Sequence, residues 1–199
     1  MDILFWSGGK DAYLALQFYR KEHPEATTRL LTTYDETDEI VPHQQIKLKN
    51  IRKQAASLGL DLITVPLPPE CPNDVYLERV GKALSDTDEP VGKLIFGDWH
   101  LNDIRSWREK VFGDMGYKCC FPIWQKSIHD LLPVLFFKPI KIKISAVGEE
   151  YQHLIRKGES FNQSFVQQIA HQPKEIDPMG ENGEFHTEII FKDLDELVE

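Results

Sequence analysis

The 199 residues are 41% hydrophobic and 28% charged, which suits one compact domain or a domain with a small appendage. The 23 basic and 32 acidic side chains leave a formal net charge of −9, which argues against nucleic acid or an acidic membrane as a partner. The three cysteines have no metal-binding spacing, and no apolar run approaches the roughly 20 residues of a membrane span, so we expect a reduced, cytoplasmic setting.

Strands and helices are predicted to alternate over the first 125 residues. An apolar strand at residues 3–6 runs through a glycine-rich turn into a helix at 12–21. Further strands are expected at 29–34, 61–67 and 93–98, and further helices at 46–58, 73–84 and 104–112. This order predicts an α/β fold, a doubly wound parallel sheet whose ligands bind at the carboxyl ends of its strands.

The remainder of the chain has a less regular pattern. The sequence predicts a helix at 127–137 interrupted by Pro133, a half-exposed strand at 138–145 in which lysine alternates with isoleucine, two short helices at 150–156 and 164–169, a strand at 188–191 and an acidic helix at 192–199. We therefore expect a nucleotide-binding domain over residues 1–125 and a smaller C-terminal α+β subdomain over residues 126–199.

Residues 7–11, Ser-Gly-Gly-Lys-Asp, have the composition of an anion-binding loop. Adjacent glycines can turn successive backbone N–H groups toward one point, and the helix that follows adds the positive end of its dipole. The alternative is an ordinary turn between a strand and a helix. The flanking Ser7, Lys10 and Asp11 favour the binding loop.

Three further places carry candidate functional residues, each with a structural alternative. Asp98 ends a predicted strand beside the loop and is a second candidate carboxylate, or a plain turn residue. Trp124 could line a pocket or pack as a hinge. Residues 177–187 have glycines three apart, at 180 and 183, together with Glu181, Glu184 and His186, and could form a metal site, an acid/base pair or a hairpin turn.

The motifs also carry a family resemblance. Ser7-Gly8-Gly9-Lys10-Asp11 resembles the motif Ser-Gly-Gly-x-Asp-Ser of the PP-loop ATP pyrophosphatases, although Ala12 stands in place of the final serine. The segment 180–187, Gly-Glu-Asn-Gly-Glu-Phe-His-Thr, is similar to a signature of the diphthine–ammonia ligase family within that group. Scattered matches to the same family include His43, Gln54-Ala55, Gly97-Asp98, Arg105, Glu109 and Pro122-Ile123-Trp124.

This resemblance implies a fold of the HUP/PP-loop type and amide formation, in which ATP activates a carboxylate as an acyl-adenylate, pyrophosphate leaves and ammonia attacks. It implies ATP and Mg²⁺ as cofactors, ammonium and a small-molecule or protein carboxylate as partners, and a homodimer as one possible assembly. The implied ATP-binding residues are Ser7, Gly8, Gly9, Lys10, Asp11, His43, Gly97 and Asp98, with Asp11 and Asp98 also holding the metal. The implied catalytic residues are Glu181, Glu184 and His186, and the implied substrate-binding residues are Arg105, Glu109, Trp124 and Thr187.

Other functions remain open at this point. The chain could bind an adenine nucleotide or cleave it at the α-phosphate while acting on a small metabolite, and the departure at Ala12 favours this reading slightly. It could also be a regulator without catalysis. A PP-loop enzyme that thiolates tRNA is disfavoured, because Cys119 and Cys120 lack the usual spacing and the net charge is negative.

Overall fold

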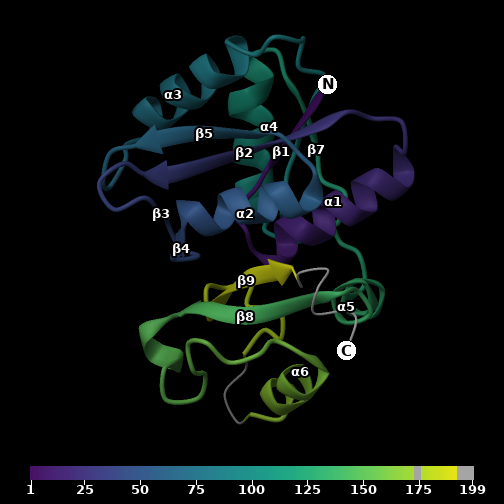
Figure 1. The fold of residues 1–199 in the computed structure, drawn as a ribbon. Helices are drawn as coiled ribbons and strands as arrows, with labels where there is room; N and C mark the ends of the chain where they lie inside the picture. The colour runs from purple at the N-terminus through teal and green to yellow at the C-terminus, as the bar shows by residue number, and fades with distance from the viewer. Residues whose placement is uncertain (173–175, 192–199) are drawn as a thin grey trace.

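The central element of the molecule is a mostly parallel sheet, seen in a computed structural model that describes residues 1–172 and 176–191 (Figure 1). Its five parallel strands pair in the order β5-β2-β1-β6-β7. They are β1 (Asp2–Phe5), β2 (Thr28–Asp35), β5 (Leu62–Leu67), β6 (Lys93–Ile95) and β7 (Lys118–Cys120). Two short antiparallel strands, β3 (Ile40–Val41) and β4 (Ile46–Lys47), extend the sheet beyond the end of β2.

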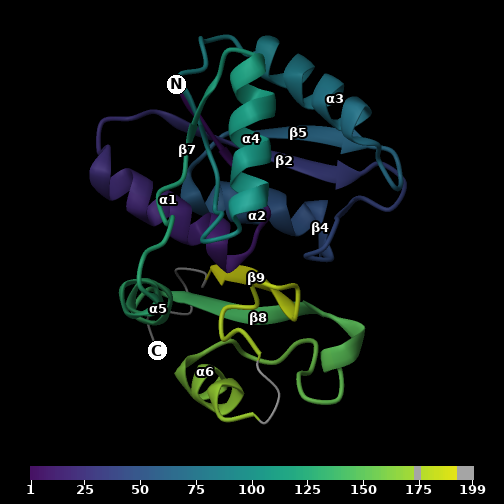
Figure 2. The same ribbon diagram turned by 180° about the vertical axis from the view of Figure 1, so that it is seen from behind.

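Helices cover both faces of this sheet, which confirms the predicted doubly wound α/β architecture. Figures 1 and 2 show α1 (Lys10–Glu22) and α2 (Leu48–Leu58) on one face, and α3 (Asn73–Ser85) and α4 (Asn102–Asp114) on the other. Neighbouring residues of a strand point to opposite faces. Leu4 accordingly joins the core beneath α1 and α2, whereas Ile3 joins the core beneath α3 and α4.

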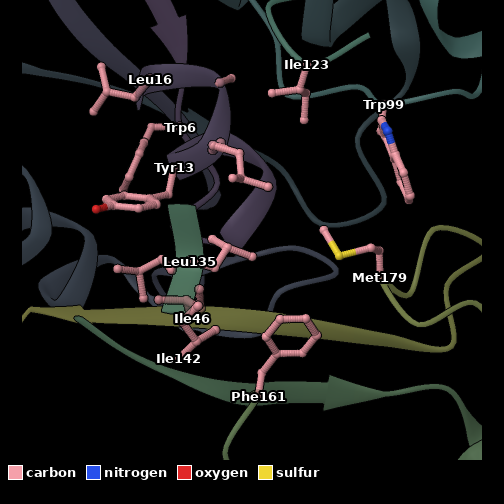
Figure 3. Packing of buried hydrophobic residues seen from close by; sticks show 14 of the residues in the cluster. Trp6, Tyr13, Leu16, Ile46, Trp99, Ile123, Leu135, Ile142, Phe161 and Met179 are labelled. Atoms are coloured by element: carbon pink, nitrogen blue, oxygen red, sulfur yellow. The ribbon is translucent and has the colours of Figure 1, made fainter. Parts of the chain in front are cut away.

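A second, two-stranded sheet packs against the α1 and α2 side. Strands β8 (Ile140–Val147) and β9 (Phe185–Phe191) pair in antiparallel fashion, with α5 (Ile128–Phe136), a 3₁₀ turn (Glu149–Tyr151) and α6 (Gln163–Ala170) around them. One continuous hydrophobic core joins the two sheets. Figure 3 shows it as a column of side chains that runs from Trp6 and Tyr13 to Ile142 and Phe161.

Several predicted elements are confirmed. Helices α1, α3, α4 and α6 and strands β2 and β5 agree with the predicted ranges to within a few residues. In β8, Lys141 and Lys143 are exposed and Ile142 and Ile144 are buried, as expected of a half-exposed strand. The boundary between domains at residues 125 and 126 stays a prediction, and the helix predicted at 192–199 lies outside the described residues.

Other predicted elements were wrong in extent. Helix α2 begins at Leu48, because Ile46 and Lys47 pair with β3. Strand β9 begins at Phe185 and not at Glu188, and therefore includes His186 and Thr187. Helix α5 continues through Pro133, with Leu131 and Leu135 buried in the core. The short strand β7 was not predicted. None of the helices in the described part of the chain is both long and apolar enough to cross a bilayer.

Candidate functional site

A cavity of about 810 Å³ opens at the carboxyl ends of β1 and β6, where the strand order of the sheet reverses. Such a switch point is the usual ligand site of an open α/β sheet. The lining residues come from the ends of the parallel strands, the start of α1, the turn between β3 and β4, helices α3 and α4, and the segment before β9. Among the predicted site residues, it includes Ser7, Asp11, His43, Gly97, Asp98, Glu181 and His186.

The glycine loop, residues 7–10, lies between β1 and α1. Gly8 has a left-handed conformation with a φ of +83°, and a Cβ atom there would lie 2.5 Å from Ile51 Cδ1, so the position requires glycine. The backbone N–H of Lys10 donates to Thr187 Oγ1 at 3.0 Å, and the N–H of Ile189 donates to the Gly8 carbonyl at 2.9 Å. Strand β9 therefore fixes the loop from a distant part of the chain.

Gln54 of α2 completes this attachment. Its Oε1 accepts a hydrogen bond from Trp6 Nε1 at 2.8 Å, while its Nε2 donates to the carbonyls of Gly8 at 3.2 Å and Ile189 at 2.7 Å. The side chain is 4% exposed. One buried amide thus joins β1, the glycine loop and β9, and the sequence had marked it only as a family match.

We expect the substitution Gln54→Met to lower the free energy of unfolding by about 2–4 kcal/mol, because buried partners of the amide lose their hydrogen bonds. Methionine has a similar length to glutamine, so the loss of stability reflects the missing hydrogen bonds and not a change in side-chain size. Chemical denaturation measures the effect. The control is Lys53→Met, on the exposed face of the same helix, which should change stability by no more than about 0.5 kcal/mol. Equal losses in the two variants would contradict this account.

Lys10 and Asp11 form an ion pair at the start of α1. The Lys10 Nζ atom lies 2.8 Å from Asp11 Oδ1 and 2.9 Å from Oδ2. The Lys10 side chain is 3% exposed, whereas that of Asp11 is 32% exposed. The carboxylate of Asp11 therefore faces the cavity, and Lys10 supports it from behind. Neither Lys10, Gly8 nor Gly9 is among the lining residues.

Gly97 allows the end of β6 to approach α1 closely. A Cβ atom on Gly97 would lie 2.7–2.9 Å from backbone atoms of Asp11 and Ala12. The next residue, Asp98, lines the same cavity as Asp11.

Asp98 has a partner that the sequence had not indicated. Arg108 Nε lies 2.7 Å from Asp98 Oδ2, and Arg108 Nη2 lies 3.3 Å from Asp98 Oδ1. The guanidinium also stacks over the Phe96 ring at 4.5 Å. In the sequence, only the helical spacing of α4, which points Arg108 toward the sheet, could have identified Arg108 as the partner of Asp98.

Glu181 is another carboxylate that lines this cavity. Burial, and then the negative charge of Asp11, raise the pKa of Glu181 to about 8, while Lys10 opposes the rise. A carboxyl group with this pKa can hold or release a proton near neutral pH, which is what a general acid or base requires.

We expect the Glu181→Gln substitution to stabilise the protein at pH 8. The pKa of Glu181 is raised on folding, so its contribution to stability is fully present below the unfolded pKa and is lost as pH rises from about 5 to about 8. Glutamine has no proton to lose, so the variant should be more stable than the native protein by at least about 1 kcal/mol at pH 8. This difference corresponds to a rise in Tm of roughly 2–4 °C. Thermal melting between these pH values measures it. The exposed Glu25→Gln is the control, and a variant as pH-sensitive as the native protein would refute the assignment.

Glu184 lies close to Glu181 in sequence but has a different environment. Its side chain is buried, and its two oxygens accept hydrogen bonds from the backbone N–H groups of Asp177 and Asn182 and from Asn182 Nδ2. Glu184 does not line the cavity. These bonds hold together the bend that Gly180 and Gly183, both with positive φ, form before β9.

Two histidines lie on the same side of the cavity. The rings of His43 and His186 have their centroids 6.1 Å apart. Burial, and then the proximity of His43, lower the pKa of His186, so its imidazole is neutral at physiological pH. His43 has a φ of +62° in the turn between β3 and β4. A neutral imidazole can both donate and accept a hydrogen bond from a ligand.

The predicted substrate-binding residues lie elsewhere. Arg105 Nε donates to Glu109 at 2.9 Å, and its guanidinium stacks on Trp124 at 4.6 Å and on Phe121 at 5.0 Å. None of these side chains lines the cavity. Thr187 is buried and accepts the Lys10 N–H. In this structure Arg105, Glu109 and Trp124 therefore pack against one another outside the cavity. Thr187 supports the glycine loop.

The carboxylates of the cavity fit Mg²⁺, which prefers hard oxygen ligands. Within residues 1–172 and 176–191, no three His, Cys, Asp or Glu side chains are grouped to hold a metal ion by themselves. Enzymes that use nucleotides usually bind Mg²⁺ through one or two carboxylates together with the phosphates. Asp11 and Asp98 offer two such carboxylates.

Comparisons with known proteins include a match to a protein family. A family model described as "Diphthamide synthase N-terminal domain" matches residues 1–119, more than half of the chain. It ends before residues 180–187, so it leaves the resemblance of that segment untested. No curated protein matches the chain. A solved structure described as a predicted subunit of tRNA methyltransferase from Methanocaldococcus jannaschii DSM covers 98% of this chain and 100% of its own, with 16% identity and a TM-score of 0.48, a likeness too weak to bear on activity.

Proposed function

The chain belongs to the diphthamide synthase family of PP-loop proteins, and from this premise we propose that it is an ATP-dependent, AMP-forming amide ligase. Membership supports an ATP pyrophosphatase-type role in general. The finer proposal is that a carboxylate on a small molecule or a protein is adenylated and then converted to an amide by ammonia. The observation that carries it is that one cavity joins Asp11, directly after the glycine loop, to Glu181 and to His186 of β9.

The first step is adenylation. An oxygen of the acceptor carboxylate attacks the α-phosphorus of ATP, the bond to the β-phosphate oxygen breaks, and pyrophosphate leaves with the electron pair. Ser7 and the start of α1 stabilise the growing negative charge electrostatically. Asp11 and Asp98 would hold Mg²⁺, which would further neutralise the charge of the pyrophosphate.

The second step is transfer of nitrogen. Ammonia attacks the acyl carbon, and the bond from that carbon to the phosphate oxygen of AMP breaks. AMP leaves with the electron pair of this bond, and one proton is released. Glu181 is suited to bind ammonium and to take this proton, because the pKa of its carboxyl is about 8. Neutral His186 orients the acyl oxygen by a hydrogen bond. We assign Glu184 a structural role, in place of the catalytic role that the resemblance implies, because its oxygens are engaged within the bend.

A second candidate is a protein that binds or hydrolyses an adenine nucleotide without ligation. The observation that favours it is Ala12, which lines the cavity where the related group carries a serine hydroxyl. In both cases we propose a cytoplasmic protein that acts without nucleic acid or membrane, as its charge of −9 supports. We propose a homodimer as a possible assembly, independently of the reaction.

The deciding experiment incubates the protein with ATP, Mg²⁺ and ammonium, with and without candidate carboxylates, and separates AMP from ADP by chromatography. The ligase proposal requires AMP and pyrophosphate that depend on the acceptor, and label from ¹⁵N-ammonium in the product. AMP formed equally without an acceptor would support the hydrolase. ADP as the product would contradict both.

A further inference from the structure

The cavity is strongly acidic for a site that would receive a nucleotide. Five carboxylate side chains line it, from Asp11, Asp35, Glu70, Asp98 and Glu181. Among the described residues that line it, Arg108 is the only lysine or arginine. A polyphosphate that enters this cavity therefore finds one fixed positive side chain at its wall.

Lys10, which the sequence had favoured for contact with phosphate, is less accessible. Its side chain is 3% exposed, and its ammonium group contacts both oxygens of Asp11. To reach a ligand it would have to leave this partly buried ion pair, which is unfavourable unless the new partner is equally good. Its contribution is to hold Asp11 in place.

Arg108 is better prepared to change its partner. Its guanidinium lies over the Phe96 ring, which fixes its plane, and the side chain as a whole is 23% exposed. Although Arg108 Nε and Asp98 Oδ2 are 2.7 Å apart, neither atom has a well-aligned hydrogen bond within the protein. Between these two atoms the contact is a close ion pair, and the hydrogen-bonding capacity of Arg108 Nε and Asp98 Oδ2 is unused. Planar guanidinium groups favour phosphate oxygens, which they can bind through two parallel N–H groups.

We propose that Arg108 is the phosphate-binding side chain of this cavity, and that it exchanges Asp98 for oxygens of the pyrophosphate part of the substrate. The exchange frees the Asp98 carboxylate for a cation at the moment the polyphosphate arrives. Phosphate is favoured over an acceptor carboxylate because Asp98 directly follows Gly97, which lies against the backbone of Asp11 next to the glycine loop. This inference rests on the proposed function only in taking ATP as the ligand.

The first test measures binding and needs no turnover. Inorganic pyrophosphate is titrated by calorimetry in EDTA into the native protein, Arg108→Gln, Arg108→Lys and the control Lys110→Gln, which removes an exposed charge from the same helix. We expect Arg108→Gln to weaken binding about tenfold or more and Arg108→Lys to weaken it less, with Lys110→Gln within about twofold. Equal binding by Arg108→Gln and the native protein would overturn the proposal.

The second test separates exchange from a purely structural role. Asp98→Asn removes the competing carboxylate, so pyrophosphate should bind about threefold or more tighter in EDTA. Conversely, Mn²⁺ alone, followed by electron paramagnetic resonance, should bind Arg108→Gln more tightly than the native protein. If Arg108 only supported the fold, Asp98→Asn would bind pyrophosphate more weakly and Arg108→Gln would bind Mn²⁺ more weakly, and these two results would overturn the proposal. If Arg108→Gln does not fold, Asp98→Asn and Arg108→Lys decide the question.

These results can be told apart from a failure of the proposed function. ADP as the product of turnover would refute the ligase and leave the pyrophosphate measurements unchanged. Pyrophosphate binding that ignores Arg108 and Asp98 would refute the inference, while AMP formation could still support the ligase.

Discussion

We expect the Asp11→Asn variant to lose AMP formation by on the order of 10²–10³-fold, the range seen when one preorganised electrostatic group is removed from an active site. The physical reason is that the Asp11 carboxylate faces the cavity, 32% exposed, with Lys10 behind it. Asparagine keeps an oxygen that Lys10 can donate to, but it removes the negative charge that would hold Mg²⁺. AMP and pyrophosphate released per enzyme, measured at saturating ATP, check the expectation.

The control for this variant is Asp86→Asn. Asp86 also pairs with a lysine, Lys82 at 2.9 Å, but on the surface of α3. It should retain full activity and nearly full stability. A melting curve of Asp11→Asn close to that of the native protein would show that lost turnover is not lost folding. Full activity in Asp11→Asn would show that the Asp11 carboxylate is not required for AMP formation, which would contradict its proposed role.

The second large effect is expected at Gly97. Substitution with alanine would put a Cβ atom 2.7–2.9 Å from the backbone of Asp11 and Ala12, and backbone atoms cannot turn aside as a flexible side chain can. Helix α1 must then shift relative to β6. We expect a loss of stability of about 1–3 kcal/mol, and weaker ATP binding because Asp11 and Asp98 separate. Denaturation and nucleotide titration measure the two effects.

Gly113 supplies a matched control. It lies in α4, and a Cβ atom there would meet nothing within 4 Å. Alanine is the better helix former by about 1 kcal/mol, so Gly113→Ala should leave stability unchanged or raise it. If Gly97→Ala and Gly113→Ala behaved alike, the close approach of β6 to α1 would not be what requires glycine at position 97.

The sequence predicted those parts of the fold whose information is local. The run of apolar residues in β2 and the amphipathic spacing of α3 were sufficient, as was Gly59, which ends α2 with a φ of +64°. Strand β7 was missed because its three residues make no periodic pattern and are held by pairing with β6. Pro133 was overrated as a helix breaker, because burial of its neighbours in the core outweighs one lost hydrogen bond.

The same distinction explains the candidate site. Motif residues that follow a strand, such as Asp98 after β6, could be placed at the cavity from topology alone. The ion pair of Asp98 with Arg108 and the triple contact of Gln54 depend on partners brought together by tertiary packing. No local pattern distinguishes Glu181, which faces the cavity, from Glu184, which is buried in the bend three residues later. These roles required the folded chain.

The attachment of the glycine loop to β9 also determines when the site can exist during synthesis. Lys10 and its partner Thr187 are separated by 177 positions, so the loop is synthesised well before its support. At roughly 5–20 residues per second, a ribosome needs about 10–40 s to cover that interval. Until then the nascent N-terminal half lacks the contacts that shape its loop. A partly synthesised chain that lacks β9 is therefore expected to lack a formed glycine loop, because the Lys10 N–H and the Gly8 carbonyl do not yet have their partners on that strand.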